Sequence, residues 1–255
     1  MFETAHRRKM FLVRLKDVYY ASEIKKDDPN VDVVYYFFCR EPHEPCKEYL
    51  TAVVDLSRDE EEILRSFRRW TRQMIKRIKD DENLEITVLE NPEIKDLLDF
   101  QRKYEAFSRE KGFFCIQYNQ LETLRSFGRL KILNACYENE LITQRVLVED
   151  DEKIVPYCCY TNRLNESNPE KIKTISCINK MVEYYSMVYW KDKGKKYYDL
   201  GGLFTDKNDE AGAKVNHYKD GFRGEHVTEY EFIYPTTRKG QLFCWLKEKT
   251  SHRIK

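Results

Sequence analysis

The sequence predicts an α+β fold, with a mixed, mostly antiparallel sheet flanked by helices and an N-terminal layer of strands. Two observations support this prediction. Runs rich in Val, Tyr and Phe open the chain and recur near its middle, which is typical of strands. Between these runs, apolar residues recur every three or four positions, which is typical of helices with one buried face. No internal repeat is visible, so we expect a strand layer over 1–56 packed on a main domain over 57–255.

The first half of the chain should hold strands and two long helices. Ser57 and Glu60 match a capping box, in which a serine oxygen and a glutamate satisfy opposite backbone donors at a helix start. The helix that follows should run to about Lys79. A second helix should begin at Asn91 with Pro92 at its first position and end near Gly112. The strands expected in this half are Phe11–Tyr20, Val31–Cys39, Tyr49–Leu56 and Leu84–Leu89.

The second half should hold a meander of strands and one parallel crossover. We expect strand Lys171–Cys177 to lead into a helix from Asn179 to Gly194, and strand Lys196–Leu200 to complete a right-handed crossover. The aromatic stripe of that helix is predicted as core. The remaining elements are helices Asn119–Leu130 and Gln241–Lys249 and strands Lys131–Tyr137, Leu141–Glu149, Ile154–Thr161 and His226–Tyr234.

Composition excludes several classes of protein. The chain has 45 Lys and Arg against 44 Asp and Glu, so its overall charge does not favour nucleic acid or an anionic membrane. No apolar run is long enough to span a membrane and no secretory signal is visible, so we expect a cytoplasmic protein without membrane insertion. The eight cysteines show no zinc-binding spacing, so we expect reduced structural thiols and no metal. A nucleophilic Cys177 is the alternative.

One face of the helix that follows Ser57 is strongly basic. Its opposite face carries the apolar residues, so the charged face points away from the core. Such a face is usually solvated, and the alternative is a surface for an anion such as a transfer RNA backbone. The basic residues are Arg65, Arg68, Arg69, Arg72, Lys76, Arg77 and Lys79.

Two stretches of the sequence carry motifs that recur in order. The first is DLSRDEEEILRSFRRWTRQMIKRIKD, and the second is WKDKGKKYYDLGGLF followed by VNHYKDGFRGE. They resemble the FemA/FemB-like branch of the GNAT superfamily of acyltransferases: the first is similar to the entry of the family's acyltransferase domain, and the second to its Tyr-Asp-x-Gly-Gly strand and later Lys-x-Gly-Phe-Gly-Gly-Glu turn. Together they cover roughly Leu50 to Pro235. The resemblance implies a GNAT-like sheet that splays in its middle and admits a thioester or aminoacyl donor.

The resemblance also implies site residues. Lys219 matches the family lysine near the transferring carbonyl, where a cation suits the oxyanion or the leaving group. Tyr218 precedes it. Glu225 is expected to act as a base or to hold Lys219, with a strand-start salt bridge as the alternative. Asp199 is expected to orient an amine, with a loop cap as the alternative.

Further residues are candidates for binding. Gly201 and Gly202 match the strand-end motif, and Ser176 and Asn179 lie at the expected strand–helix turn, where backbone amides can hold coenzyme A. The main role expected for the Asn179 side chain is to cap its own helix. The Gly-x-Gly phosphate loop of acetyl-CoA-binding enzymes is missing there, and Arg223 replaces the family's second turn glycine. The substrate-binding candidates are Arg145, Arg163 and His217, each of which can instead be an ordinary polar or paired surface group.

The resemblance implies a GNAT-like N-acyltransferase that moves an acyl group, from acyl-CoA or an acyl carrier, to an amine such as an amino sugar of a cell-surface glycan. An alternative is aminoacyl-tRNA-dependent transfer to a peptidoglycan precursor, with the basic helix Arg65–Lys79 contacting the tRNA. The chain has about half the expected length of full FemA/FemB ligases, which counts against that alternative. The third hypothesis is a GNAT fold that only binds a partner and does not catalyse a reaction. The residues do not indicate an oligomeric state.

Overall fold

The computed structural model describes residues 2–7, 13–21, 30–111, 116, 118–206 and 208–251. The chain forms two compact units, one of Met1–Thr51 with Val227–Lys255 and the other of Ala52–His226. Strands β4 (Cys46–Asp55) and β10 (Glu225–Pro235) run from one unit into the other. The domain boundary predicted at residue 56 stays a prediction.

The first unit is a small sheet covered by a helix. Its strands lie in the order β1 (Phe2–Arg7), β2 (Arg14–Tyr19), β3 (Val33–Cys39) and β10, and only β2 and β3 run parallel within it. Helix α7 (Arg238–Ser251) packs Phe243 against strand residues such as Leu15 and Val33. It begins three residues before the expected Gln241 because Thr237 accepts a hydrogen bond from the amide of Gly240 at 3.1 Å. Phe11 and Leu12 of the first predicted strand lie outside the described residues.

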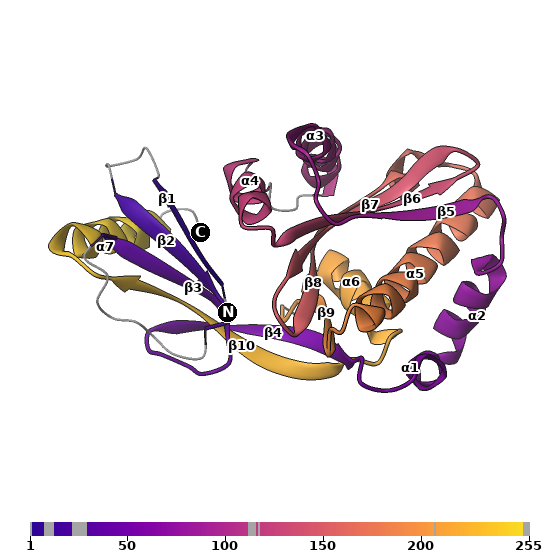
Figure 1. The fold of residues 1–255 in the computed structure, drawn as a ribbon, viewed down its shortest axis with the longest axis horizontal. Helices are drawn as coiled ribbons and strands as arrows, with labels where there is room; N and C mark the ends of the chain where they lie inside the picture. Colours follow the sequence, from indigo (N-terminus) through magenta and orange to yellow (C-terminus); the bar gives the residue numbers. More distant parts are fainter. Residues whose placement is uncertain are drawn as a thin grey trace. The chain divides into compact units, whose positions relative to one another are not determined.

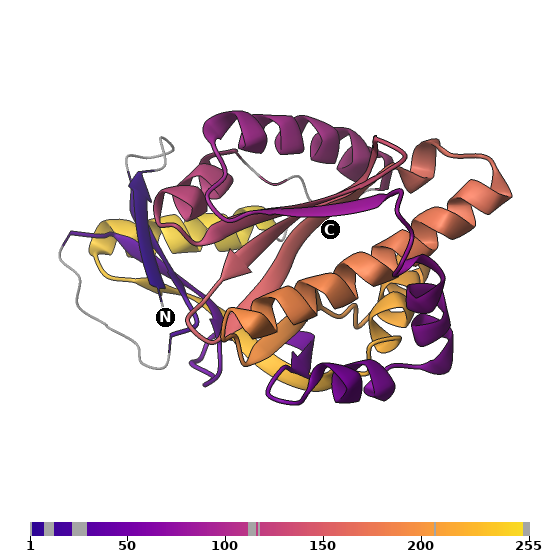
Figure 2. The ribbon, with the colours of Figure 1, turned by 45° about the vertical axis from the view of Figure 1, so that its right-hand side comes forward.

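The second unit contains the larger sheet and confirms the mixed, mostly antiparallel prediction (Figure 1). Strand pairs β5–β6, β6–β7 and β7–β8 are antiparallel, whereas β8 and β9 are parallel. Figures 1 and 2 show α3 and α4 on one face of the sheet and α5 with α2 on the other. The sheet order is β4, β9 (Tyr197–Gly202), β8 (Lys153–Thr161), β7 (Glu140–Glu149), β6 (Leu130–Tyr137) and β5 (Leu84–Leu89).

The basic helix expected after Ser57 is two helices, α1 (Glu60–Ser66) and α2 (Arg69–Ile78). Phe67 and Arg68 between them are extended, so the prediction of one continuous helix is wrong. Phe67 is 1% exposed and packs edge-on against Phe222, and the amide of Arg68 donates to the carbonyl oxygen of Gly221 at 2.9 Å. Tertiary contacts therefore stabilise the break. The cap is Asp59, whose carboxylate accepts from the amide of Glu62, and not Ser57.

The largest error concerns α5 (Pro169–Asp192), because the predicted strand Lys171–Cys177 is its first half. The side chain of Asn168 accepts hydrogen bonds from the amides of Glu170 and Lys171 at 2.9 and 3.4 Å, and Pro169 occupies the first helical turn. Ile172 and Ile175 of this segment are three positions apart, which is helical spacing, and the cap lies eleven residues before Asn179. The parallel crossover is therefore β8–α5–β9.

The remaining helices differ from prediction mainly at their ends. Helix α3 (Ile94–Lys111) begins after the predicted cap at Asn91, with the amide of Glu93 donating to Asp96 at 2.7 Å. Helix α4 (Tyr118–Ser126) stops before Leu130, which begins β6. A short 3-10 helix (Asn162–Asn165) precedes α5, and α6 (Glu210–Asp220) follows β9.

The core of the second unit surrounds α5, whose aromatic stripe is buried as predicted. Tyr184, Met187 and Trp190 are all at most 2% exposed. Among the described residues, no helix is long and apolar enough to cross a membrane. The described cysteines are free thiols, and Cys177 is buried inside α5 and not at a strand–helix turn; Cys115 lies outside the described residues.

Candidate functional site

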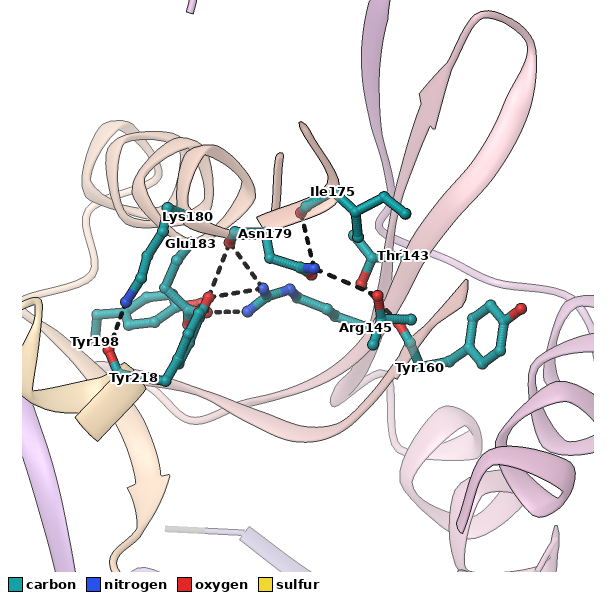
Figure 3. A network of polar contacts seen from close by, with 10 residues as sticks. Thr143, Arg145, Tyr160, Ile175, Asn179, Lys180, Glu183, Tyr198 and Tyr218 are labelled. Atoms are coloured by element: carbon teal, nitrogen blue, oxygen red, sulfur yellow. Dashed lines mark hydrogen bonds and ion pairs between the residues drawn. The ribbon is translucent and has the colours of Figure 1, made fainter. Parts of the chain in front are cut away.

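The centre of the candidate site is a buried ion pair between the sheet and α5. Arg145 on β7 contacts the carboxylate of Glu183 on α5, and the two side chains are 5% and 3% exposed (Figure 3). Arg145 also donates to the carbonyl oxygen of Asn179 at 3.0 Å. Burial opposes the charge of the guanidinium, but Glu183 overrides it and raises the pKa of Arg145 well above its usual value. Arg145 is therefore a permanent cation held by α5.

Two tyrosines complete the shell of Glu183. Tyr198 on β9 donates its hydroxyl to one carboxylate oxygen at 2.9 Å, and the hydroxyl of Tyr218 on α6 lies 3.1 Å from the other. The hydroxyl of Tyr218 is also 2.9 Å from the carbonyl oxygen of Asn179. Burial and then the charge of Glu183 raise the pKa of both phenols, so both stay protonated. The network thus ties β7, α5, β9 and α6 together.

Lys219, the next residue of α6, lies where the parallel ladder ends. Strands β8 and β9 pair through Lys153–Tyr197 and Ile154–Tyr198, although β9 continues to Gly202. The amine of Lys219 donates to the carbonyl oxygen of Gly202 at 2.6 Å. A lysine amine therefore satisfies a strand carbonyl beyond the last paired residues of the two strands.

Gly201 lies directly beside that amine. Its φ is +79°, which favours glycine, and a Cβ there would lie 3.5 Å from both Lys219 Nζ and the carbonyl oxygen of Pro156 on β8. Burial lowers the pKa of Lys219, although Glu183, Cys159 and Asp199 act in the opposite direction. The amine therefore releases its proton more readily than that of a surface lysine.

Asp199 is occupied by structural partners. Its carboxylate forms an ion pair with Lys153 at 3.1 Å and accepts a hydrogen bond from the amide of Gly201 at 2.8 Å. The ion pair joins the first residue of β8 to the β9 residue that follows the last paired one, and the second bond fixes the backbone of Gly201 near the end of β9. These contacts match the loop-capping alternative for Asp199.

Lys180 occupies a box of aromatic rings beside this network. It is 2% exposed, and its amine lies 4.5, 3.7 and 4.3 Å from the ring centroids of Trp70, Tyr218 and Phe222. The amine donates to the carbonyl oxygen of Tyr218 at 2.5 Å. Burial lowers the pKa of Lys180 to about 7.

Several predicted site residues lie elsewhere. Ser176 and Asn179 are in the interior of α5, so the helix start that was expected to hold coenzyme A there is absent; the hydroxyl of Ser176 donates to the carbonyl oxygen of Ile172. The side chain of Asn179 donates to Ile175 and Thr161 and does not cap a helix. Arg163 is exposed in the 3-10 helix, and the exposed His217 stacks on Trp70 with 5.3 Å between ring centroids.

Glu225 is exposed at the start of β10. Within the described ranges, no hydrogen bond or ion pair joins it to Lys219. The structure thus brings Arg145, Tyr218 and Lys219 together with Gly201 and Gly202, and leaves Arg163, His217 and Glu225 outside this group. The catalytic and binding roles of all these residues stay predictions.

Lys180 and Glu183 were missed from the sequence. Both interrupt the apolar stripe of α5, three positions apart and between Ile178 and Tyr184. Charged residues are rarely buried without partners, so two of them within a predicted core stripe were a usable signal. The strand misassigned to Lys171–Cys177 concealed it, because it placed the start of the helix next to them.

Several basic side chains of α1 and α2 are engaged in local contacts. Arg68 pairs with Asp220 at 2.7 Å, and Arg65 pairs with Glu61. Arg72 donates to the carbonyl oxygens of Arg65 and Phe67 at the end of α1. Arg69 and Lys76 are exposed. The hypothesis that α1 and α2 form an anion-binding surface therefore depends on fewer cations than the sequence indicated.

Several solved structures have a similar fold. The crystal structure of FemX matches 95% of this chain and 85% of its own, with a TM-score of 0.62 and 11% identity. A putative lysylphosphatidylglycerol synthetase C-terminal domain from Agrobacterium fabrum matches with 0.50 and 11%, over 83% of this chain and 71% of its own. The structure of L-PGS from Bacillus licheniformis matches with 0.50 and 14%, over 81% and 68%. No family model and no curated protein matches the sequence.

The predicted α+β fold is thereby confirmed, and it is similar to that of FemX. The chain covers 85% of the FemX structure, and the half-length expectation for full FemA/FemB ligases stays a prediction. At these identities the similarity concerns the fold, and the chemistry must be argued from the side chains.

Proposed function

We propose that this protein is an acyltransferase that moves an acyl or aminoacyl group to an amine, with Lys219 as its catalytic residue. One observation carries the proposal: the partly desolvated amine of Lys219 lies beside Gly201 and Gly202, where the ladder between β8 and β9 ends. An extended donor that contains amide groups can pair with strand backbone at such a place. The reacting carbonyl would then lie next to the amine.

The chemistry requires a proton donor and a cation at one point. The acceptor nitrogen forms a bond to the donor carbonyl carbon, which gives a tetrahedral oxyanion. The carbon–sulfur or carbon–oxygen bond to the leaving group then breaks, the nitrogen loses a proton and the leaving group gains one. A protonated Lys219 suits both the oxyanion and the leaving group, and its lowered pKa favours the transfer of its proton.

The neighbouring residues divide between chemistry and support. The hydroxyl of Tyr218 already lies within hydrogen-bond distance of Asn179 and Glu183, so we assign it to orienting the end of α6. Asp199 orients the Gly201–Gly202 turn through its bond to the amide of Gly201. Glu225 is exposed and remains our candidate for a base that takes the proton from the acceptor amine.

Two donor classes compete. Acyl-CoA is the donor that the resemblance to GNAT enzymes implies, with an amino sugar of a cell-surface glycan as the acceptor. An aminoacyl-tRNA donor, with a peptidoglycan precursor as the acceptor, is supported by the overall similarity to FemX and by the exposed cations Arg69 and Lys76. A fold that binds a ligand without catalysis is the remaining alternative.

The test compares donors and variants in one design. The protein is incubated with acetyl-CoA or with charged tRNA, together with a panel of amines that includes amino sugars, and donor consumption is measured. We expect consumption with one donor class, and a loss of at least about 100-fold in Lys219→Met, as for other general acid–base groups. Lys214→Met is the matched control on the exposed face of α6 and should retain activity. Equal activity in both variants would exclude Lys219 as the catalytic residue.

A further inference from the structure

The aromatic box around Lys180 connects three elements to the residue next to Lys219. Its rings come from α2 (Trp70), from α6 (Tyr218) and from the turn after α6 (Phe222), while Lys180 itself lies in the middle of α5. The amine donates to the carbonyl oxygen of Tyr218, which is one of the last carbonyls of α6. The same carbonyl oxygen accepts one long backbone bond, from the amide of the C-cap Gly221 at 3.3 Å, and a cation at this end also complements the helix dipole.

The aromatic box around Lys180 is tightly packed. A Cβ on Gly221 would lie 2.4 Å from Thr71 Oγ1 and 2.9 Å from both the amine of Lys180 and the Trp70 ring. Gly221 is the C-cap of α6, and its carbonyl oxygen accepts from the amide of Arg68. The end of α6 is therefore pressed onto α2 and α5 with the Lys180 amine at the contact point.

Burying a lysine in an aromatic box of this kind is energetically unfavourable. A buried ammonium loses its hydration, whereas a methionine of similar length would pack against the same rings without that cost. What lysine adds is a directed hydrogen bond to one carbonyl oxygen. That bond fixes the axial position of the last turn of α6, and Lys219 is the next residue along it.

We propose that Lys180 is a positioning residue: by bonding the carbonyl oxygen of Tyr218, it holds the last turn of α6 so that the amine of Lys219 stays at Gly202. The proposal rests on the proposed function for the importance of Lys219, but the geometric claim can be measured without any enzymatic activity. The network of Arg145, Glu183 and Tyr198 holds the hydroxyl end of Tyr218, and Lys180 holds its backbone end.

The test measures the chemical reactivity of individual lysines. Wild type and Lys180→Met are labelled with a limiting amount of an amine-reactive acetylating reagent at fixed pH, and the labelling rate of each lysine is determined by mass spectrometry. Loss of a bond that fixes a buried carbonyl should release the α6 turn and raise the labelling rate of Lys219 about tenfold. The exposed Lys214 on the same helix should not change.

A matched control separates positioning from general destabilisation. Lys131 is also buried, and its amine also donates to carbonyl oxygens, those of Glu90 and Gly128. Lys131→Met should lower stability and leave the labelling of Lys219 unchanged. If Lys180→Met does not fold, Lys180→Gln carries the same test, because its side chain is too short to reach the same carbonyl in the same geometry.

The outcomes distinguish this proposal from the proposed function. Faster labelling of Lys219 in folded Lys180→Met, and not in Lys131→Met, supports the positioning role even if no donor is consumed by the wild type. Labelling of Lys219 within about twofold of wild type overturns it, even if the protein proves to be an acyltransferase. Where activity is found, Lys180→Met should lower kcat more than it changes KM, since it displaces a catalytic group and not a substrate contact.

Discussion

Arg145 and Glu183 offer the sharpest test of the energetics of this site. Their side chains are 5% and 3% exposed, so neither charge can be hydrated if the other is removed. Two unit charges about 4 Å apart attract by about 4 kcal/mol at an effective dielectric constant of about 20. Removal of one partner of a buried pair costs about 3–5 kcal/mol, because the remaining charge is left without compensation. We therefore expect Arg145→Met and Glu183→Leu each to lower the free energy of unfolding by about that amount.

The double variant Arg145→Met/Glu183→Leu measures the interaction free energy between the two side chains. With both charges replaced by apolar side chains, no uncompensated charge remains, and the loss should be well below the sum of the two single losses. Some loss remains, because the carbonyl oxygen of Asn179 loses its bond from Arg145 and the hydroxyl of Tyr198 loses its acceptor.

The assay is equilibrium unfolding in urea at neutral pH, followed by circular dichroism and by tryptophan fluorescence, since Trp190 is buried in the same core. The exposed pair of Arg65 and Glu61 is the control, and the corresponding substitutions there should have little effect. If the two single losses add to the double loss within about 0.5 kcal/mol, the two side chains do not interact energetically and the central network is wrongly described.

Three further predictions concern the elements that hold the site. The pKa of Lys180 falls from 10.5 to about 7 on folding, so between these values the unfolded chain binds more protons and the free energy of unfolding should rise with pH. In urea unfolding from pH 7 to 9, the wild type should gain roughly 1 kcal/mol per pH unit relative to Lys180→Met. Equal slopes in the two proteins would contradict the lowered pKa of Lys180. Gly221→Ala should cost about 1–3 kcal/mol, because its Cβ meets Thr71 Oγ1 at 2.4 Å; a wild-type melting temperature would show that the turn after α6 is looser than described. Asn168→Ala should cost about 1 kcal/mol by removing the α5 cap, whereas Ser57→Ala, at the cap position expected from the sequence, should cost little; the reverse order in thermal unfolding would restore the sequence-based cap.

The boundaries of elements show where local sequence signals succeed. The strands of the meander, β3 and β4 lie close to their predicted ranges, because alternation and β-branched residues are local properties, whereas β1 (Phe2–Arg7) was not predicted. The strand predicted at Lys171–Cys177 overlooked such signals. Ile172, Ile175 and Ile178 recur every three positions, and the side chain of Asn168 caps the segment, so both local signals indicate a helix. The break at Phe67 had no local signal, since neither Pro nor Gly is present there.

The sequence by itself determined the α+β class, the resemblance that placed Lys219 near Gly201 and Gly202, and the aromatic core stripe of α5, because each depends on residues close together in the chain. Only the tertiary structure decided that Arg145 pairs with Glu183, 38 positions away, and that Lys180 bonds to Tyr218, also 38 positions away. A buried charge is stable only where distant elements supply its partner. That partner is set by how β7, α5 and α6 pack, and no local pattern in the sequence encodes it.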